Sequence, residues 1–220
     1  MENEAEVNGK NLNEDIIEEK IIYETLKRGM DICLSLIGII LLSPVLCIVA
    51  IFIKKDSKGP VIFSQKRVGY KGKEFKMYKF RSMVIDAEEI KKQLEKENEM
   101  SGPMFKMKDD PRITKIGKFI RKTSIDELPQ LFNVLKGEMS LVGPRPSLPH
   151  EVEEFEEWML IRLKVKPGLT CYWQVMGRNN IEFEDWMKLD KKYVEKRSLV
   201  LDIKLIFKTF FVLFGDKNAY

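Results

Sequence analysis

Two adjacent carboxylates, Asp126 and Glu127, form the pattern in this chain that is most able to do chemistry. They follow a stretch of seventeen residues, 106–122, that contains seven Lys or Arg side chains and two Asp. Anionic substrates would be attracted to such a basic region. A carboxylate held beside a bound phosphate could act as an oxygen nucleophile, so the pair invites a catalytic interpretation.

The same residues also fit a structural interpretation. Ser124 and Glu127 match a capping box, in which the two side chains bind the free amides at the start of a helix. Pro129 favours a first turn, so we expect the helix to begin between Ser124 and Asp126. The helix N-terminus and the nearby cations would lower the pKa of a carboxylate and attract phosphate. The spacing alone leaves both interpretations open.

The composition indicates one domain with a membrane segment. The chain has 220 residues, enough for one substantial core. Seven acids and two lysines make up the charge of residues 1–20, which we expect to form a disordered acidic leader. The three cysteines lack metal-ligand spacing, and the single histidine, His150, excludes a histidine-rich zinc site.

Basic residues are most frequent between Lys54 and Arg81, where ten Lys or Arg stand against two acids. This density suits anionic lipid head groups or phosphorylated ligands. Nucleic acid is the competing partner, but the sequence has no helix-turn-helix spacing, zinc knuckle or RNA-binding aromatic motif. We therefore expect membrane lipids and phosphorylated ligands as partners, and no nucleic acid.

An uncharged apolar run of 22 residues, 32–53, is long enough to cross a bilayer. Ser43 and Pro44 lie at its middle, where proline breaks a regular helix. Basic residues flank both ends, and the positive-inside rule then places both ends in the cytoplasm. We therefore expect residues 21–55 to form a re-entrant hairpin broken at Ser43-Pro44, with Ser43 binding a backbone group freed at the bend. A kinked spanning helix is the alternative.

The remaining patterns predict an α+β fold, a mostly helical small globular domain with a short β-hairpin. The hairpin strands are expected at 59–65 and 73–80, and a later strand at 167–175. Helices are expected at 85–100, 115–122, 125–136, 150–164, 183–196 and 200–214. The last helix is too short to cross a bilayer, so it packs in the core or lies as an amphipathic helix in the membrane interface.

Four blocks of sequence are more specific than these patterns. They are Lys79-Phe80-Arg81-Ser82-Met83, the segment 124–137 with the acid pair, the segment 139–146 with its Gly-Pro-Arg-Pro loop, and Lys166-Pro167-Gly168-Leu169-Thr170. Together they closely resemble the bacterial sugar transferase family, the monotopic polyprenyl-phosphate phosphoglycosyl transferases. The resemblance covers about residues 25–215 in a single order.

The resemblance implies transfer of a sugar 1-phosphate from a UDP-sugar to undecaprenyl phosphate, with release of UMP. This would be the first membrane step in the assembly of a bacterial surface glycan. It places residues 56–220 as a catalytic domain on the cytoplasmic face of the inner membrane. It also supports the re-entrant hairpin, because family members break this helix at Ser-Pro. The chain resembles the minimal catalytic form of the family.

The resemblance also assigns roles to residues. Asp126 would be the nucleophile that holds the sugar phosphate covalently. With no histidine cluster, the divalent ion would be hard, hence Mg²⁺ bound through Asp126 and Glu127, and Glu127 could instead transfer a proton. Substrate and phosphate contacts are expected from five further residues, which are Arg81, Arg121, Arg145, Gln174 and Arg178.

One departure from the family and one alternative function remain. Cys171 stands where the family commonly has glycine, which affects the expected backbone geometry, and no partner residue supports Cys171 as a nucleophile. The alternative is a non-catalytic membrane-surface scaffold of a glycan-assembly complex. The sequence leaves the sugar, the glycan pathway and homo-oligomerisation open.

Overall fold

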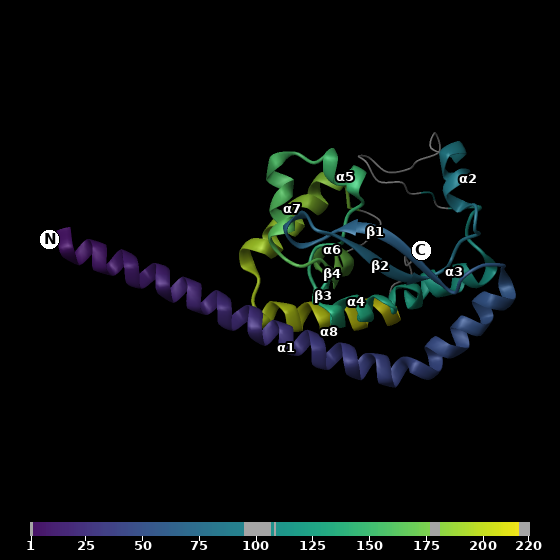
Figure 1. The fold of residues 1–220 in the computed structure, drawn as a ribbon, viewed down its shortest axis with the longest axis horizontal. Helices are drawn as coiled ribbons and strands as arrows, with labels where there is room; N and C mark the ends of the chain where they lie inside the picture. Colours follow the sequence, from purple (N-terminus) through teal and green to yellow (C-terminus); the bar gives the residue numbers. More distant parts are fainter. Residues whose placement is uncertain (1, 95–106, 108, 177–180, 216–220) are drawn as a thin grey trace.

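In the computed structural model, a mixed α+β domain sits on one very long helix, α1 (Figure 1). The structure describes residues 2–94, 107, 109–176 and 181–215. The strands are β1 (Ile62–Val68), β2 (Glu74–Phe80), β3 (Ser140–Val142) and β4 (Gly168–Thr170). The helices are α1 (Glu2–Asp56), α2 (Ala87–Leu94), α3 (Lys115–Lys122), α4 (Gln130–Lys136), α5 (Pro149–Glu153), α6 (Tyr172–Val175), α7 (Phe183–Lys196) and α8 (Leu199–Gly215), with 3-10 turns η1 (Tyr70–Gly72), η3 (Ile125–Glu127) and η4 (Glu157–Lys164).

Helix α1 is continuous through Pro44, and the apolar part of α1 changes direction beneath the domain (Figure 1). Proline cannot donate a hydrogen bond to the carbonyl of Ile40, four residues earlier. The Ser43 hydroxyl donates to that carbonyl at 2.8 Å instead. The predicted local partner at the bend is therefore present, and it lets the helix continue. The expected helix-break-helix is one bent helix, and its topology in a membrane stays a prediction.

The segment Lys20–Asp56 is long and apolar enough to cross a membrane by length and composition, and only 11% of its most apolar stretch is buried against the domain. Helix α1 begins at Glu2, before this segment. The expected disorder of the acidic leader, residues 1–20, stays a prediction.

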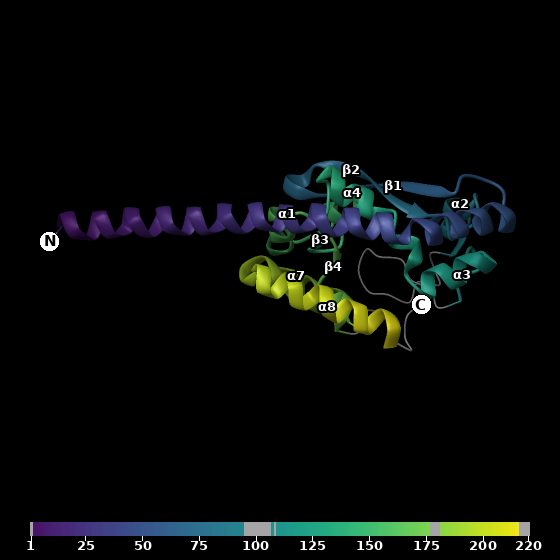
Figure 2. The same cartoon turned by 90° about the horizontal axis from the view of Figure 1, so that it is seen from below.

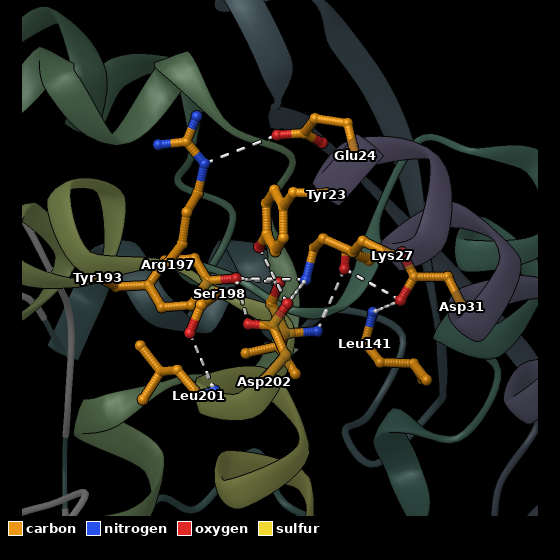
Figure 3. Close-up of polar contacts among 12 residues, drawn as sticks. Tyr23, Glu24, Lys27, Asp31, Leu141, Tyr193, Arg197, Ser198, Leu201 and Asp202 are labelled. Atoms are coloured by element: carbon orange, nitrogen blue, oxygen red, sulfur yellow. Dashed lines mark hydrogen bonds and ion pairs between the residues drawn. The ribbon is translucent and has the colours of Figure 1, made fainter. Parts of the chain in front are cut away.

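A buried polar cluster fastens α1 to the domain (Figure 3). Asp202 on α8 is fully buried, and its Oδ2 accepts from Lys27 Nζ at 2.6 Å and from Tyr23 Oη at 3.0 Å. Its Oδ1 accepts from Tyr193 Oη on α7 at 2.8 Å. Three helices therefore meet at one carboxylate.

Two neighbouring residues of α1, Arg28 and Asp31, bind α4 and β3. Arg28 donates to the carbonyls of Val134 and Leu135, at 2.6 and 2.7 Å, near the C-terminus of α4 where cations are favoured. Asp31, 2% exposed, accepts from the Leu141 amide at 2.9 Å and from a β3 hydroxyl. The start of the apolar run is thus held against both α4 and β3.

The domain contains two short sheets. Strands β1 and β2 form the predicted antiparallel hairpin, with Ile62 opposite Phe80 and η1 at its turn. Strands β3 and β4 are parallel. Gly143 and Gly168 let their ends approach closely, because a Cβ on Gly168 would collide with the amide of Gly143. This close approach places the Gly-Pro-Arg-Pro loop beside β4.

The largest differences from the predicted elements outside the acid-pair segment lie at residues 150–164 and 167–175. The helix expected at 150–164 is divided into α5 and η4, and the strand expected at 167–175 ends at Thr170 and continues as α6. In both places aromatic packing decides the backbone. Phe155 is buried at the division, and Trp173 stacks on Trp186 with ring centroids 4.6 Å apart. Helices α3 and α7 match their predicted bounds.

Helix α8 has one buried and one exposed apolar face. Asp202 and Leu205 are buried, whereas Phe207, Phe210 and Phe211 are 62%, 56% and 75% exposed. Helices α1 and α8 lie side by side on the same side of the domain (Figure 2). Large exposed apolar side chains on both helices are typical of a surface that contacts lipid or protein.

Candidate active site

The acid pair lies on a short 3-10 turn, η3, between α3 and α4. Ser124 precedes it in the left-handed conformation, with φ 55°, and forms no side-chain cap. The predicted capping box was therefore wrong, and the following α-helix begins only at Gln130. The left-handed residue therefore lies between the end of α3 and η3.

Glu127 is bound by two cations from distant parts of the chain. Lys79 Nζ on β2 lies 2.8 Å from Glu127 Oε1, and Arg145 Nη1 in the Gly-Pro-Arg-Pro loop lies 3.3 Å from the same oxygen. The side chains of Lys79 and Glu127 are only 16% and 17% exposed. Burial lowers the pKa of Lys79, and the charge of Glu127 opposes that shift. Glu127 thus holds two cationic side chains close to its neighbour Asp126.

Asp126 lies in a different environment although it is adjacent. It is 8% exposed, and within the described part of the chain no donor forms a hydrogen bond with its carboxylate. Burial raises the pKa of Asp126 to about 6, Glu127 adds to the rise, and Lys79, Arg121 and Arg145 oppose it. The expected lowering of a carboxylate pKa was wrong for Asp126, because the desolvation exceeds the effect of the cations.

The two arginines nearest the acid pair come from the elements on either side. Arg121, in the last turn of α3, is close enough to act on the charge of Asp126. The guanidinium of Arg145 lies over the Trp173 ring, 5.7 Å from its centroid, while one nitrogen reaches Glu127. The fold thus brings together Asp126, Glu127 and two of the arginines predicted to bind substrate or phosphate.

Arg81 is used differently. It is 5% exposed and donates to the carbonyl of Ser57 at 2.8 Å and to that of Lys58. Gly59 leaves room for it, since a Cβ at Gly59 would collide with the guanidinium. These bonds join the end of β2 to the loop after α1. The predicted phosphate contact of Arg81 stays a prediction.

The other predicted contacts are less well placed. Gln174 is 7% exposed in α6, directly after the tryptophan beneath Arg145. Arg178 lies outside the described residues. Cys171 is fully buried, and burial raises the pKa of its thiol, so it is a packing residue rather than a nucleophile.

Lys79 is the residue that the sequence reasoning missed. Its block was noted, but the phosphate prediction selected Arg81, two positions later. Strand alternation offers no reason to prefer one over the other, because residues i and i+2 share a face. Only the packing of β2 against η3 shows that Lys79 faces the acid pair.

The acid pair supplies only part of the oxygen ligands that a hard cation needs. Among the described residues, no group of three or more His, Cys, Asp or Glu side chains could hold a metal ion. Two adjacent carboxylates are nevertheless the usual protein share of a Mg²⁺ site, because Mg²⁺ keeps several waters and takes phosphate oxygens from its substrate. Asp126 and Glu127 therefore suit a metal that arrives with a phosphorylated ligand.

The whole arrangement is that of a family. A model of the bacterial sugar transferase family matches residues 22–216, which covers α1 from its domain-proximal part through α8. The chain belongs to the bacterial sugar transferase family. The match includes the bent helix, the acid pair and the Gly-Pro-Arg-Pro loop, so the elements that position the site are family elements.

Characterised relatives share much of this region. The chain is 54% identical over 198 residues to the galactosyl transferase CpsE of Streptococcus agalactiae. It is 45% identical over 199 residues to the undecaprenyl-phosphate galactose phosphotransferase of Salmonella typhimurium, and 42% identical over 208 residues to the UDP-glucose:undecaprenyl-phosphate glucose-1-phosphate transferase of Escherichia coli. These alignments cover 88%, 89% and 90% of this chain, but 43%, 42% and 42% of the three relatives.

Proposed function

We propose that this chain transfers a sugar 1-phosphate from a UDP-sugar to undecaprenyl phosphate through a covalent intermediate on Asp126. The names of the Salmonella and Escherichia relatives support the donor and acceptor classes. The observation that carries the proposal is the contrast within the acid pair. Glu127 is tied to Lys79 and Arg145, whereas Asp126 is buried among the same cations without a hydrogen-bond donor from the described residues.

This contrast suits a nucleophile. A carboxylate that accepts several hydrogen bonds is a weak nucleophile. A carboxylate without positive charge nearby would repel a phosphate. Lys79, Arg121 and Arg145 supply positive charge around Asp126 and would bind the diphosphate of the donor. A pKa of about 6 leaves most of the Asp126 carboxylate ionised at neutral pH.

The reaction would have two steps. In the first, an Asp126 oxygen attacks the phosphorus that carries the sugar, the bond from that phosphorus to the UMP oxygen breaks, and UMP leaves with the electron pair. In the second, a phosphate oxygen of undecaprenyl phosphate attacks the same phosphorus and Asp126 leaves as a carboxylate. Separating the steps lets a soluble donor and a lipid acceptor use one site in turn.

A bound Mg²⁺ would neutralise part of the charge that develops on the phosphate oxygens. Asp126 and Glu127 are the residues that would hold it, with substrate oxygens completing its shell. Glu127 has a second task that needs no metal, since it holds Lys79 and Arg145 within reach of the donor phosphates.

The exposed apolar surface supports a place at the membrane. Phe119 on α3 and Phe132 on α4 are 55% and 46% exposed, and they flank the turn that carries Asp126. With the exposed aromatic face of α8, they would let this side of the domain lie in the lipid interface. The basic flanks of the apolar run favour the cytoplasmic face of the inner membrane.

The test is UMP release from a panel of UDP-sugars by the membrane-bound protein, with and without undecaprenyl phosphate. We expect Asp126→Asn to lower release by about 1000-fold or more, because the nucleophile is lost. Without acceptor, the wild-type protein should accumulate one sugar phosphate on the peptide that contains Asp126, as seen by mass spectrometry.

Asp185→Asn is the matched control, since Asp185 is an exposed aspartate on α7 that pairs only with a surface lysine among the described residues. It should release UMP as the wild type does. Unchanged release by Asp126→Asn would reject the nucleophile. Lipid binding without release from any UDP-sugar would favour a scaffold instead.

A further inference from the structure

Another buried arginine, Arg162, contacts the loop that carries Arg145. Its side chain is 2% exposed, and its Nη2 lies 3.0 Å from Oδ2 of Asp190 on α7, which is 1% exposed. The rings of Phe155 and Trp186 lie 5.4 and 5.9 Å from the guanidinium. A charge this deeply buried needs a partner, and Asp190 provides it.

The Arg162 guanidinium also donates to the Gly-Pro-Arg-Pro loop and to Ser147 directly after it, and its Nη1 lies 3.4 Å from Met187 Sδ. Its Nη2 donates to the carbonyl of Arg145 at 2.6 Å, and its Nη1 donates to the Ser147 hydroxyl at 2.9 Å. The carbonyl of Ser147 in turn accepts from the amide of Val68 at the end of β1. One planar side chain therefore binds the residues on both sides of Pro146, Arg145 through its carbonyl and Ser147 through its hydroxyl.

The two arginines are also joined through aromatic rings. Arg145 lies over Trp173, Trp173 stacks on Trp186, and Trp186 lies against Arg162. Arg162 thus binds the carbonyl of Arg145. The side chain of Arg145 lies over the Trp173 ring and reaches Glu127 at 3.3 Å. The backbone and the side chain of Arg145 are fixed by the same layer of residues.

We propose that Arg162, anchored by Asp190, is a positioning residue that holds Arg145 in place for the donor phosphates. The inference rests on the proposed function and deepens it. Stability alone is a weak explanation for the pair, because well-packed apolar residues commonly replace a buried ion pair at no loss of stability. Lysine could keep the charge opposite Asp190, but it lacks the planar fork that reaches two loop acceptors at once.

The test is a double-mutant cycle with Arg162→Lys and Arg145→Gln, measured as kcat and KM for UMP release. Arg162→Lys alone should lower kcat by roughly 10- to 100-fold, as for a misplacement of about 1 Å, with KM for the UDP-sugar changed much less. If Arg162 acts through Arg145, Arg162→Lys has almost no further effect in the Arg145→Gln background. Losses that multiply would overturn the inference.

Two variants keep the test sound. Ser147→Ala removes one loop contact and leaves the ion pair, so it should show a smaller kcat loss with the same dependence on Arg145. Arg197→Lys is the matched control, because Arg197 is a part-buried arginine that pairs with Glu24. It should alter thermal stability without changing kcat. A wild-type protein that releases no UMP would reject the proposed function and this inference with it.

Discussion

The molecule contains two clusters of carboxylates and cations that differ in how completely their charges are satisfied. In the docking cluster, Asp202 accepts from Lys27, Tyr23 and Tyr193 and is fully buried (Figure 3). In the acid pair, Glu127 is bound by two cations while Asp126 has no hydrogen-bond donor among the described residues. Both clusters draw their members from distant elements.

The difference distinguishes a structural cluster, which holds α1 on the domain, from a cluster that could bind a ligand. Three donors on one carboxylate leave it little capacity to bind anything else, and the gain is a fixed position of α1 against α7 and α8. A buried carboxylate with cations around it but no donor upon it has an unfavourable environment that a ligand can improve. Burial raises the pKa of Asp126 to about 6 because the ionised form is desolvated, and raised pKa values of this kind are common at functional sites.

The largest effect on stability is expected at the docking cluster. Lys27→Met leaves Asp202 buried without its cation, so we expect the free energy of unfolding to fall by about 3–5 kcal/mol. UMP release per folded molecule should stay within about twofold of the wild type, because Lys27 belongs to the cluster that holds α1 on the domain. Thermal unfolding in detergent, with activity corrected for the folded fraction, measures both. Lys20→Met, on an exposed part of the same helix, is the control.

At the acid pair the pattern should be reversed. Lys79→Gln removes a charged donor beside both carboxylates, and we expect UMP release to fall by about 100-fold. Thermal stability should fall less than in Lys27→Met, since Arg121 and Arg145 keep their positions. Lys76→Gln, an exposed lysine on the same strand, should change neither quantity. A large stability loss with normal UMP release would instead show that the acid pair has a structural role.

The smallest effect is a shift in pH dependence. Because the proposed nucleophile is the ionised carboxylate of Asp126, kcat/KM should fall about tenfold per pH unit below about 6 and level off above it. Lys79 lowers the pKa of Asp126 and Glu127 raises it. The midpoint should therefore move to higher pH in Lys79→Gln and to lower pH in Glu127→Gln. A pH profile with no acid limb near 6 would contradict the raised pKa.

Local patterns predicted the elements whose structure depends on nearby residues. The hairpin, α3 and α7 follow from turn residues and helical spacing, and Ser43 at the bend follows from the hydrogen bond that Pro44 cannot make. The predictions were wrong where distant packing decides the backbone, as at the division between α5 and η4 and in α6 after Thr170. Buried aromatic rings determine those bends, and sequence spacing does not show their partners.

The sequence by itself determined the chemistry available to this protein. It contains an acid pair in a basic region, an uncharged apolar run with proline at its middle, and blocks that place it in the bacterial sugar transferase family. Only the tertiary structure decided that Glu127 is ion-paired while Asp126 has no hydrogen-bond donor among the described residues. Lys79 and Arg145 reach Glu127 from other parts of the chain. Burial, which raises the pKa of Asp126, likewise exists only once β2, α3 and the Gly-Pro-Arg-Pro loop have packed around it.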